Sequence, residues 1–175
     1  MLEVSEGIPE EVLNAVSSGA GEQMDAGYRA WIPGQARPFS RRTSHTITKR
    51  GVSIVRNYMV PGSAEWKRAA RKILKATPGQ MYLMDPVWLE VHVFRAKAKG
   101  RSCNMRYPTV RPDATNLLKL IEDALIGVAF LDDSQVVVQH TYKRYHKDVI
   151  EGVYVAVGPM GEVYDGTDGT GFVRR

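Results

Sequence analysis

Cysteine is almost absent from this sequence, which has only Cys103 among its 175 residues. A single cysteine cannot form a disulfide within the chain, and its scarcity favours a reducing, cytoplasmic setting. Long apolar runs are also absent, since no segment approaches the roughly 18–20 apolar residues that span a bilayer. The acidic N-terminus lacks the basic start and apolar block of a secretory signal. We therefore expect a cytoplasmic protein that does not bind membranes.

Several ligand-binding motifs are missing as well. There is no Gly-x-x-x-x-Gly-Lys loop and no Gly-x-Gly-x-x-Gly turn, so we expect no nucleotide cofactor. The histidines lack zinc-ligand spacing, and one cysteine cannot build a zinc finger. A Ser/His/Asp triad stays open, although no pattern points to one. The four histidines are His45, His92, His140 and His146.

Charge is distributed unevenly along the chain. Residues 1–26 contain six acids and no Lys or Arg, a net charge of −6. Residues 29–111 contain 18 Lys or Arg and three acids, a net charge of +15. Residues 112–175 contain six Lys or Arg and ten acids, a net charge of −4, so the three segments together give the overall charge of +5. A block this basic favours binding to a polyanion such as nucleic acid, while a merely solvated surface is the alternative.

The stretch 111–139 combines acids with a helical pattern. Arg-Pro keeps the chain extended before Asp113, because the residue before proline avoids the helical region. Asp113 and Thr115 are both good N-cap types, Gly127 is a C-cap type, and valines dominate a strand predicted at 135–142. The apolar positions at helical spacing are Leu117, Leu118, Leu120, Ile121, Ala124, Leu125 and Val128.

Four acids in this stretch can be interpreted in two ways. Asp113, Asp123, Asp132 and Asp133, with the isolated Lys119, suit a site that holds a divalent cation against a polyanion. Alternatively, Asp113 is only a helix cap, Asp132 and Asp133 form a solvated turn, and Asp123 pairs with Lys119 on one helix face. Spacing alone does not choose between these interpretations.

The same residues resemble the RusA-type crossover-junction endonucleases, or Holliday junction resolvases, which are common in bacteriophages and prophages. The matching signature is Arg-Pro-Asp-x-x-Asn-Leu-x-Lys at 111–119, Asp-Ala-Leu at 123–125 and Asp-Asp-x-Gln-Val-Val at 132–137. The resemblance runs roughly from residue 28 to residue 159 and is loose before residue 85. It implies a bacterial, phage-type or prophage-type protein.

The resemblance also implies site residues. By position, Asp113 and Asp133 look like metal-binding carboxylates, with Asp132 as a catalytic and metal-binding helper and Lys119 as a catalytic lysine. Asn116 and Asp123 match supporting positions. Thr115, also a supporting position, departs from the pattern, because many relatives have a second aspartate there, and a hydroxyl is an uncharged, poorer ligand. Asp123 or Asp132 could compensate for the missing carboxylate.

The rest of the chain predicts an α+β fold, with a mixed sheet of about five strands and two main helices. We expect strands at 28–32, 87–94 and 152–157, a hairpin within 46–58, a short helix at 9–17, and a helix that Ser63 caps and 77–79 end. On the strand 87–94, the odd-numbered residues from Val87 to Val93 should share one face. We divide the chain into an acidic extension (1–26), a RusA-like nuclease domain (27–159) and a flexible Gly-rich tail (160–175).

Basic residues around the acidic stretch are the candidate DNA contacts, since phosphates are bound mainly by Lys and Arg. A solvated surface is an equally open interpretation for most of them. The candidates are Arg37, Arg41, Arg42, Lys67, Arg71, Lys97, Lys99, Arg101, Arg106, Arg111, Lys143 and Arg144.

The resemblance thus implies a Mg²⁺-dependent endonuclease that resolves four-way junctions or other branched DNA, which fits the acidic cluster and the basic block. Two symmetric cuts need two sites, and one chain has one acidic cluster, so we expect a homodimer. A DNA-binding module with weakened catalysis, suggested by Thr115, is the first alternative. A nuclease for flaps or other branches is the second.

Overall fold

A computed structural model describes residues 7–17, 25–38, 42–49, 52–58, 62–96, 107–145 and 150–160, with the backbone alone for 42–49 and 52–58. The candidate DNA contacts Arg41, Lys97, Lys99, Arg101 and Arg106 lie outside these residues, as do Cys103 and the tail beyond residue 160. No helix in the described ranges is both long and apolar enough to cross a bilayer.

The main sheet has four strands in the order β1-β6-β4-β5. They are β1 (Tyr28–Pro33), β4 (Val87–Arg95), β5 (Val136–Tyr145) and β6 (Gly152–Pro159). Strand β6 is antiparallel to both β1 and β4, whereas β4 and β5 run parallel. The mixed α+β class is therefore confirmed, but the expected count of about five strands was wrong.

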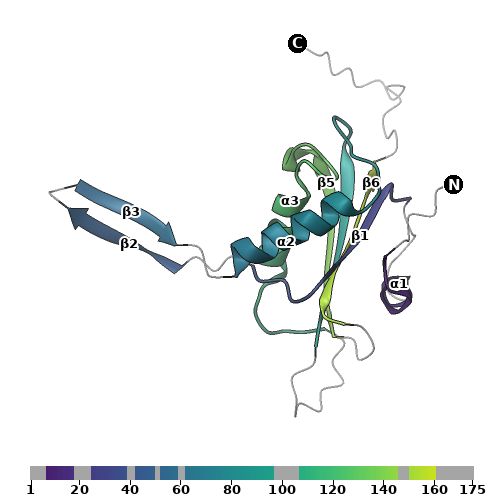
Figure 1. The fold of residues 1–175 in the computed structure, drawn as a ribbon, viewed down its shortest axis with the longest axis horizontal. Helices are drawn as coiled ribbons and strands as arrows, with labels where there is room; N and C mark the ends of the chain where they lie inside the picture. The colour runs from purple at the N-terminus through teal and green to yellow at the C-terminus, as the bar shows by residue number, and fades with distance from the viewer. Residues whose placement is uncertain are drawn as a thin grey trace, which may run out of the picture.

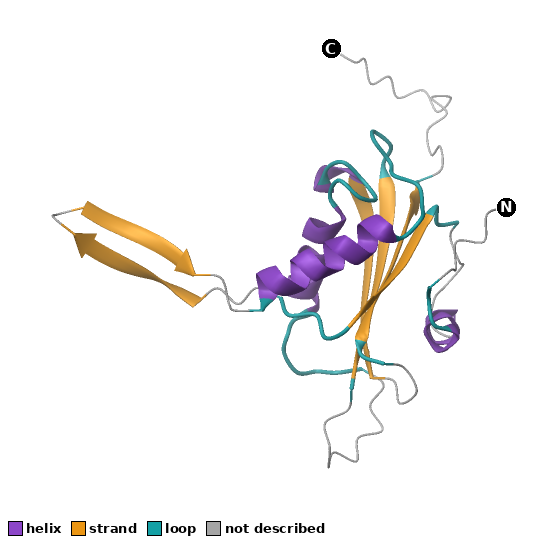
Figure 2. Cartoon of the chain, in the orientation of Figure 1, coloured by secondary structure: helices purple, strands orange, loops and turns teal. Residues whose placement is uncertain are grey.

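The hairpin does not belong to the main sheet. Strands β2 (Arg42–Lys49) and β3 (Val52–Tyr58) pair with each other in a separate two-stranded sheet. Figures 1 and 2 draw this ribbon apart from the main sheet. A hairpin within 46–58 was predicted correctly, although β2 begins earlier, at Arg42.

Helices cover both faces of the main sheet. Helices α2 (Ser63–Ala76) and α3 (Ala114–Leu125) lie on one face, and α1 (Glu10–Ser17) lies on the other (Figure 1). The alternation of β4 accounts for the two layers. Its residues Val87, Leu89, Val91 and Val93 enter the core with α2 and α3, as predicted. Trp88 and Phe94 enter the second core with α1.

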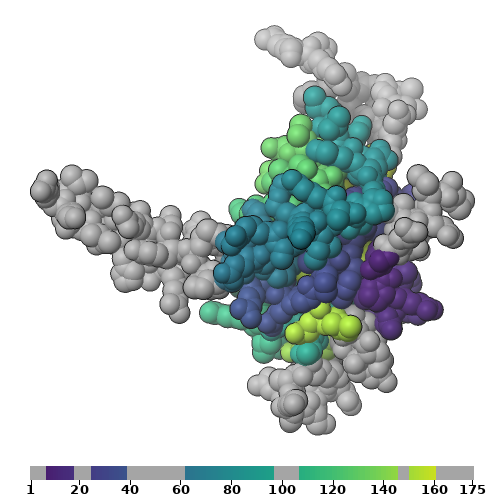
Figure 3. Space-filling view, in the orientation of Figure 1, coloured from purple at the N-terminus to yellow at the C-terminus, as the bar shows by residue number. Residues whose placement is uncertain are grey.

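Helix α1 belongs to the acidic segment 1–26, and it is packed rather than projecting. Val12, Ala15 and Val16 are buried against Trp31 and Trp88 of the sheet. In Figure 3, α1 lies at the lower right of the body, while α2 covers the centre of the visible face. The apolar residues of this short helix thus close the second face of the sheet, while Glu10 and Glu11 remain exposed.

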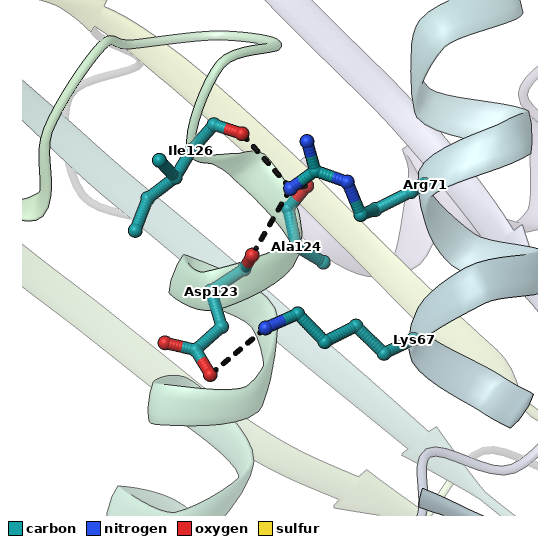
Figure 4. Close-up of polar contacts among 5 residues, drawn as sticks. All are labelled: Lys67, Arg71, Asp123, Ala124 and Ile126. Carbon is teal, nitrogen blue, oxygen red and sulfur yellow. Dashed lines mark hydrogen bonds and ion pairs between the residues drawn. The ribbon is translucent and has the colours of Figure 1, made fainter. Parts of the chain in front are cut away.

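Two cations of α2 join it to the end of α3 (Figure 4). Arg71 Nη1 donates to the carbonyl oxygens of Ile126 at 2.9 Å and of Asp123 and Ala124 at 3.3 Å each. Lys67 Nζ lies 3.1 Å from Asp123 Oδ2. These carbonyls are at a helix C-terminus, where they lack intrahelical partners and where positive charge is favourable.

Candidate functional site

Asp113 occupies the N-cap position of α3, in an extended conformation (φ −71°, ψ 148°). Its backbone carbonyl accepts the Leu117 amide at 3.2 Å, which is the first hydrogen bond of the helix. Its carboxylate, however, makes no capping hydrogen bond, and the residue is exposed. The side chain predicted as either a cap or a ligand is therefore not used as a cap.

The segment that leads into Asp113 is held by cations from the sheet. Lys143 Nζ on β5 donates to the carbonyl oxygens of Val110 at 2.9 Å and Pro112 at 2.8 Å. Arg95 Nη1 on β4 donates to the carbonyl oxygen of Arg111 at 2.7 Å. The backbone that carries Asp113 is thus tied to the C-terminal ends of two neighbouring parallel strands.

Asp132 and Asp133 lie in a tight turn before β5. Residues Asp133–Gln135 form a 3₁₀ turn, η1, and the Asp132 carboxylate caps it by accepting the Ser134 amide at 2.9 Å. Hydrogen bonds from Ser134 lower the pKa of the Asp132 carboxyl. Both acids are exposed. Asp132 therefore has a structural task in this turn, as one interpretation of the sequence held.

Gln135 fixes the turn to the rest of the chain. Its Oε1 accepts the amides of Leu131 at 2.8 Å and Asp132 at 3.0 Å. Its Nε2 donates to the Tyr82 carbonyl at 3.3 Å and the Asp85 carbonyl at 3.0 Å. The backbone at Asp133 is therefore positioned by a glutamine that bridges two loops.

Helix α3 divides its polar side chains between two directions. Asp123 turns toward α2 and pairs with Lys67, rather than with Lys119 on its own helix. Glu122 turns toward β5, where its carboxylate accepts a hydrogen bond from Gln139. Lys119, Thr115 and Asn116 are exposed along the helix.

Glu122 is an acid that the sequence interpretation did not include. Burial raises the pKa of its carboxyl, and the nearby negative charges of Asp133 and Asp123 add to this effect. Lys119 acts in the opposite direction. The available signal was spacing, because Glu122 follows Thr115 and Lys119 on one helix face, at i, i+4 and i+7.

Asp113 and Asp133, the two carboxylates expected to bind the metal, lie at opposite ends of the unit formed by α3 and β5. Asp113 begins α3, whose 12 residues rise about 18 Å. Lys143, which holds the Asp113 segment, is late in β5, whereas Asp133 precedes the first residue of that strand. The seven residue steps of strand from Val136 to Lys143 span about 23 Å. One chain therefore does not bring Asp113 and Asp133 together.

No cluster of three or more His, Cys, Asp or Glu side chains suited to a metal ion occurs in the described part of the chain. The donor chemistry nevertheless fits a hard cation, since exposed carboxylate oxygens are the ligands that Mg²⁺ prefers. Among the described residues of one chain, those oxygens do not converge at one point.

The candidate DNA contacts fall into different environments. Arg37 and Arg111 are exposed. Arg144 is only 2% exposed and donates to the Ala15 carbonyl of α1 at 2.6 Å. Lys67, Arg71 and Lys143 hold the internal partners described above. For Arg42, the structure describes the backbone within β2 alone.

A family model described as "Endodeoxyribonuclease RusA" matches residues 32–158. The matched region begins within β1 and ends within β6, so it includes the whole of α2, α3 and β5. A comparison with curated proteins gave no match.

Proposed function

Because the chain belongs to the RusA endodeoxyribonuclease family, we propose that it is a Mg²⁺-dependent endonuclease that resolves four-way DNA junctions by phosphodiester hydrolysis. The family indicates endodeoxyribonuclease activity in general. The proposal for this chain rests on the match of residues 32–158, within which Asp113 presents an exposed carboxylate that makes no capping bond. We assign the nuclease domain to residues 27–159.

Asp113 and Asp133 are the proposed metal ligands, with Asp132 as a helper. A Mg²⁺ ion held there would polarise the scissile phosphate and lower the pKa of a bound water. Asp113 suits this role because its side chain is exposed and not used as a cap. Asp132 retains its capping bond to Ser134, so we assign it the lesser part.

A homodimer follows from the separation of these acids. If both Asp113 and Asp133 act at one phosphate, their placement at opposite ends of α3 and β5 requires a second copy of the chain. We propose that each site combines Asp113 of one subunit with Asp133 of the other. A twofold axis would then create two equal sites, which suits two symmetric cuts.

Lys119 and its neighbours provide the charge around the reacting phosphate. The Lys119 ammonium is exposed on α3 and would stabilise the negative charge that develops in the transition state. Asn116 and Thr115 lie on the exposed surface of the same helix and are proposed as supporting residues. Asp123 supports the site indirectly, because its pairing with Lys67 ties α3 to α2.

The DNA arms are proposed to bind mainly by their backbone phosphates, at the exposed candidate DNA contacts of the segment 29–111. Arg37 and Arg111 are the described candidates whose side chains are open to solvent. Binding of this kind releases counterions, so junction affinity should fall steeply as the salt concentration rises.

The deciding experiment measures cleavage of a synthetic four-way junction by the purified chain, with Mg²⁺ and with a chelator. We expect paired, symmetric cuts that need Mg²⁺. Asp133→Asn should abolish cleavage while junction binding persists, and retained cleavage would remove Asp133 from the site. Junction binding without cutting by the wild type would instead support the weakened binding module that Thr115 suggests, and a preference for flaps would identify another branched substrate.

Mixing two inactive variants tests the shared site. A dimer of one Asp113→Asn chain and one Asp133→Asn chain retains one intact site only if each site combines the two subunits. Nicking should therefore return on mixing, at one strand of the junction. A site built within one chain would leave the mixture inactive.

A further inference from the structure

Three successive backbone carbonyls before Asp113 each accept a hydrogen bond from a cationic side chain. Lys143 Nζ donates to the carbonyl oxygens of Val110 at 2.9 Å and of Pro112 at 2.8 Å. Arg95 Nη1 donates to the carbonyl oxygen of the intervening Arg111 at 2.7 Å. The segment belongs to no helix or strand, so these contacts supply partners that regular structure would otherwise provide. All three hydrogen bonds therefore hold the segment 110–112, directly before Asp113.

The sheet explains why these two cations converge. Strands β4 and β5 are parallel and adjacent, so their C-terminal ends lie at one edge. Val93, which is opposite Lys143 in the register, packs in the core with α3. Side chains alternate along a strand, so Lys143 and Arg95 share the α3 side, whereas Arg144 lies on the α1 side and donates to Ala15.

We propose that Lys143, assisted by Arg95, is a positioning residue for the Asp113 carboxylate, which deepens the proposed function and rests on it. No capping hydrogen bond orients this carboxylate, so its direction depends on the backbone from Val110 to Asp113. That backbone is fixed on one side by the sheet cations and on the other by the bond from the Leu117 amide to the Asp113 carbonyl. Loss of Lys143 removes two of the hydrogen bonds by which the sheet cations hold this segment.

This role differs from a contact with DNA. Two of the three donors of the Lys143 ammonium point at backbone carbonyls, and the residue is half-buried. A phosphate contact contributes mainly to substrate affinity and to its salt dependence. A group that positions a metal ligand contributes to the rate of the bound complex, because a displacement of about 1 Å in a reacting group can cost roughly 100-fold.

The test compares Lys143→Met and Lys143→Arg with a matched control, Lys75→Met. Lys75 is exposed on α2 and its removal changes the net charge equally. In junction cleavage with Mg²⁺, we expect Lys143→Met to lower kcat by roughly 10–100-fold with KM within about threefold, and to need more Mg²⁺ for half-maximal rate. Lys143→Arg should recover part of kcat, and Lys75→Met should retain the wild-type kcat.

A second readout does not depend on activity. Hydrogen exchange at the Leu117 amide reports on the backbone of Asp113, which accepts that hydrogen bond. It should be faster in Lys143→Met and unchanged in Lys75→Met, at equal global stability. A normal kcat with a raised KM, or unchanged Leu117 exchange, overturns the positioning role. An inactive wild type overturns the proposed nuclease function instead, and the exchange experiment still decides whether Lys143 holds the segment.

Discussion

Arg71 offers the sharpest test of how α2 and α3 are held together. In Arg71→Met the aliphatic stem remains, but the guanidinium that donates to Ile126, Asp123 and Ala124 is lost. A hydrogen bond to a charged group contributes about 1.5–3 kcal/mol, and a cation at a helix C-terminus about 0.3–1 kcal/mol. Arg71 is half-buried, so water can replace part of this. We expect a loss of about 2 kcal/mol in the free energy of unfolding.

The measurement is equilibrium unfolding, followed by far-UV circular dichroism in denaturant and by heat. For a chain of this size, about 2 kcal/mol corresponds to a decrease of about 4–8 °C in Tm. The denaturant slope should stay constant, which shows that stability rather than compactness has changed. Arg71→Lys keeps the charge but not the planar guanidinium group, so its Tm should lie between those of the wild type and Arg71→Met.

Arg68 provides the matched control, since it is exposed on the same helix. Arg68→Met should change stability by no more than about 0.5 kcal/mol. If Arg71→Met melted within about 1 °C of Arg68→Met, the carbonyl contacts would not stabilise the helix pair as argued. Because Arg71 is proposed to act within the chain, the salt dependence of junction binding should be the same in Arg71→Met as in the wild type.

Two further predictions concern pH. Burial lowers the pKa of His92 below 6.5, with the hydrogen bond to Glu90 opposing it, so the unfolded chain binds the proton more readily. The free energy of unfolding should fall as pH drops below about 6.5, and His92→Gln should remove that slope between about pH 7.5 and 5.5. Burial and the charge of Asp133 raise the pKa of Glu122 above 4.5, so its contribution is present below that value and lost as pH rises. Glu122→Gln should therefore melt higher than the wild type at pH 7, with the difference shrinking near pH 4; equal Tm values at pH 7 would contradict this.

The sequence predicted the helices and strands in which the spacing of apolar residues matches the positions that are buried in the fold. Helix α3 buries five of its predicted apolar positions, and β4 divides its side chains between two cores as its alternation required. Gly127 has a positive φ of 70° just after the helix, as a residue at the C-terminal end often does. Ser63 was wrong as a cap, because Gly62 occupies the N-cap in a left-handed conformation and Ser63 is buried in the first turn.

Pairing between distant segments could not be predicted in the same way. A strand pattern states that a segment is extended, but it does not state which strand lies beside it, so the pattern at 46–58 could not show that β2 and β3 pair apart from the main sheet. The predicted polar face of α3 likewise gave Asp123 a partner on its own helix, whereas the pair is with Lys67, 56 residues away in sequence. Glu122 and Arg95 were missed because only the tertiary fold places them beside Gln139 and Arg111.

The internal partners of the basic residues change what the net charge can be used to argue. Arg71, Lys143 and Arg144 donate to neutral carbonyls, so their hydrogen bonds are directed inward while their positive charges remain. A long-range field that attracts DNA depends on charge and survives this arrangement. A direct contact depends on a free donor at the surface, which buried Arg144 does not offer. The net charge of +15 in residues 29–111 therefore predicts encounter with DNA well, but it predicts poorly which side chains touch the DNA. Exposed residues such as Arg37 and Arg111 should account for more of the salt dependence of junction binding than the residues that donate to internal carbonyls.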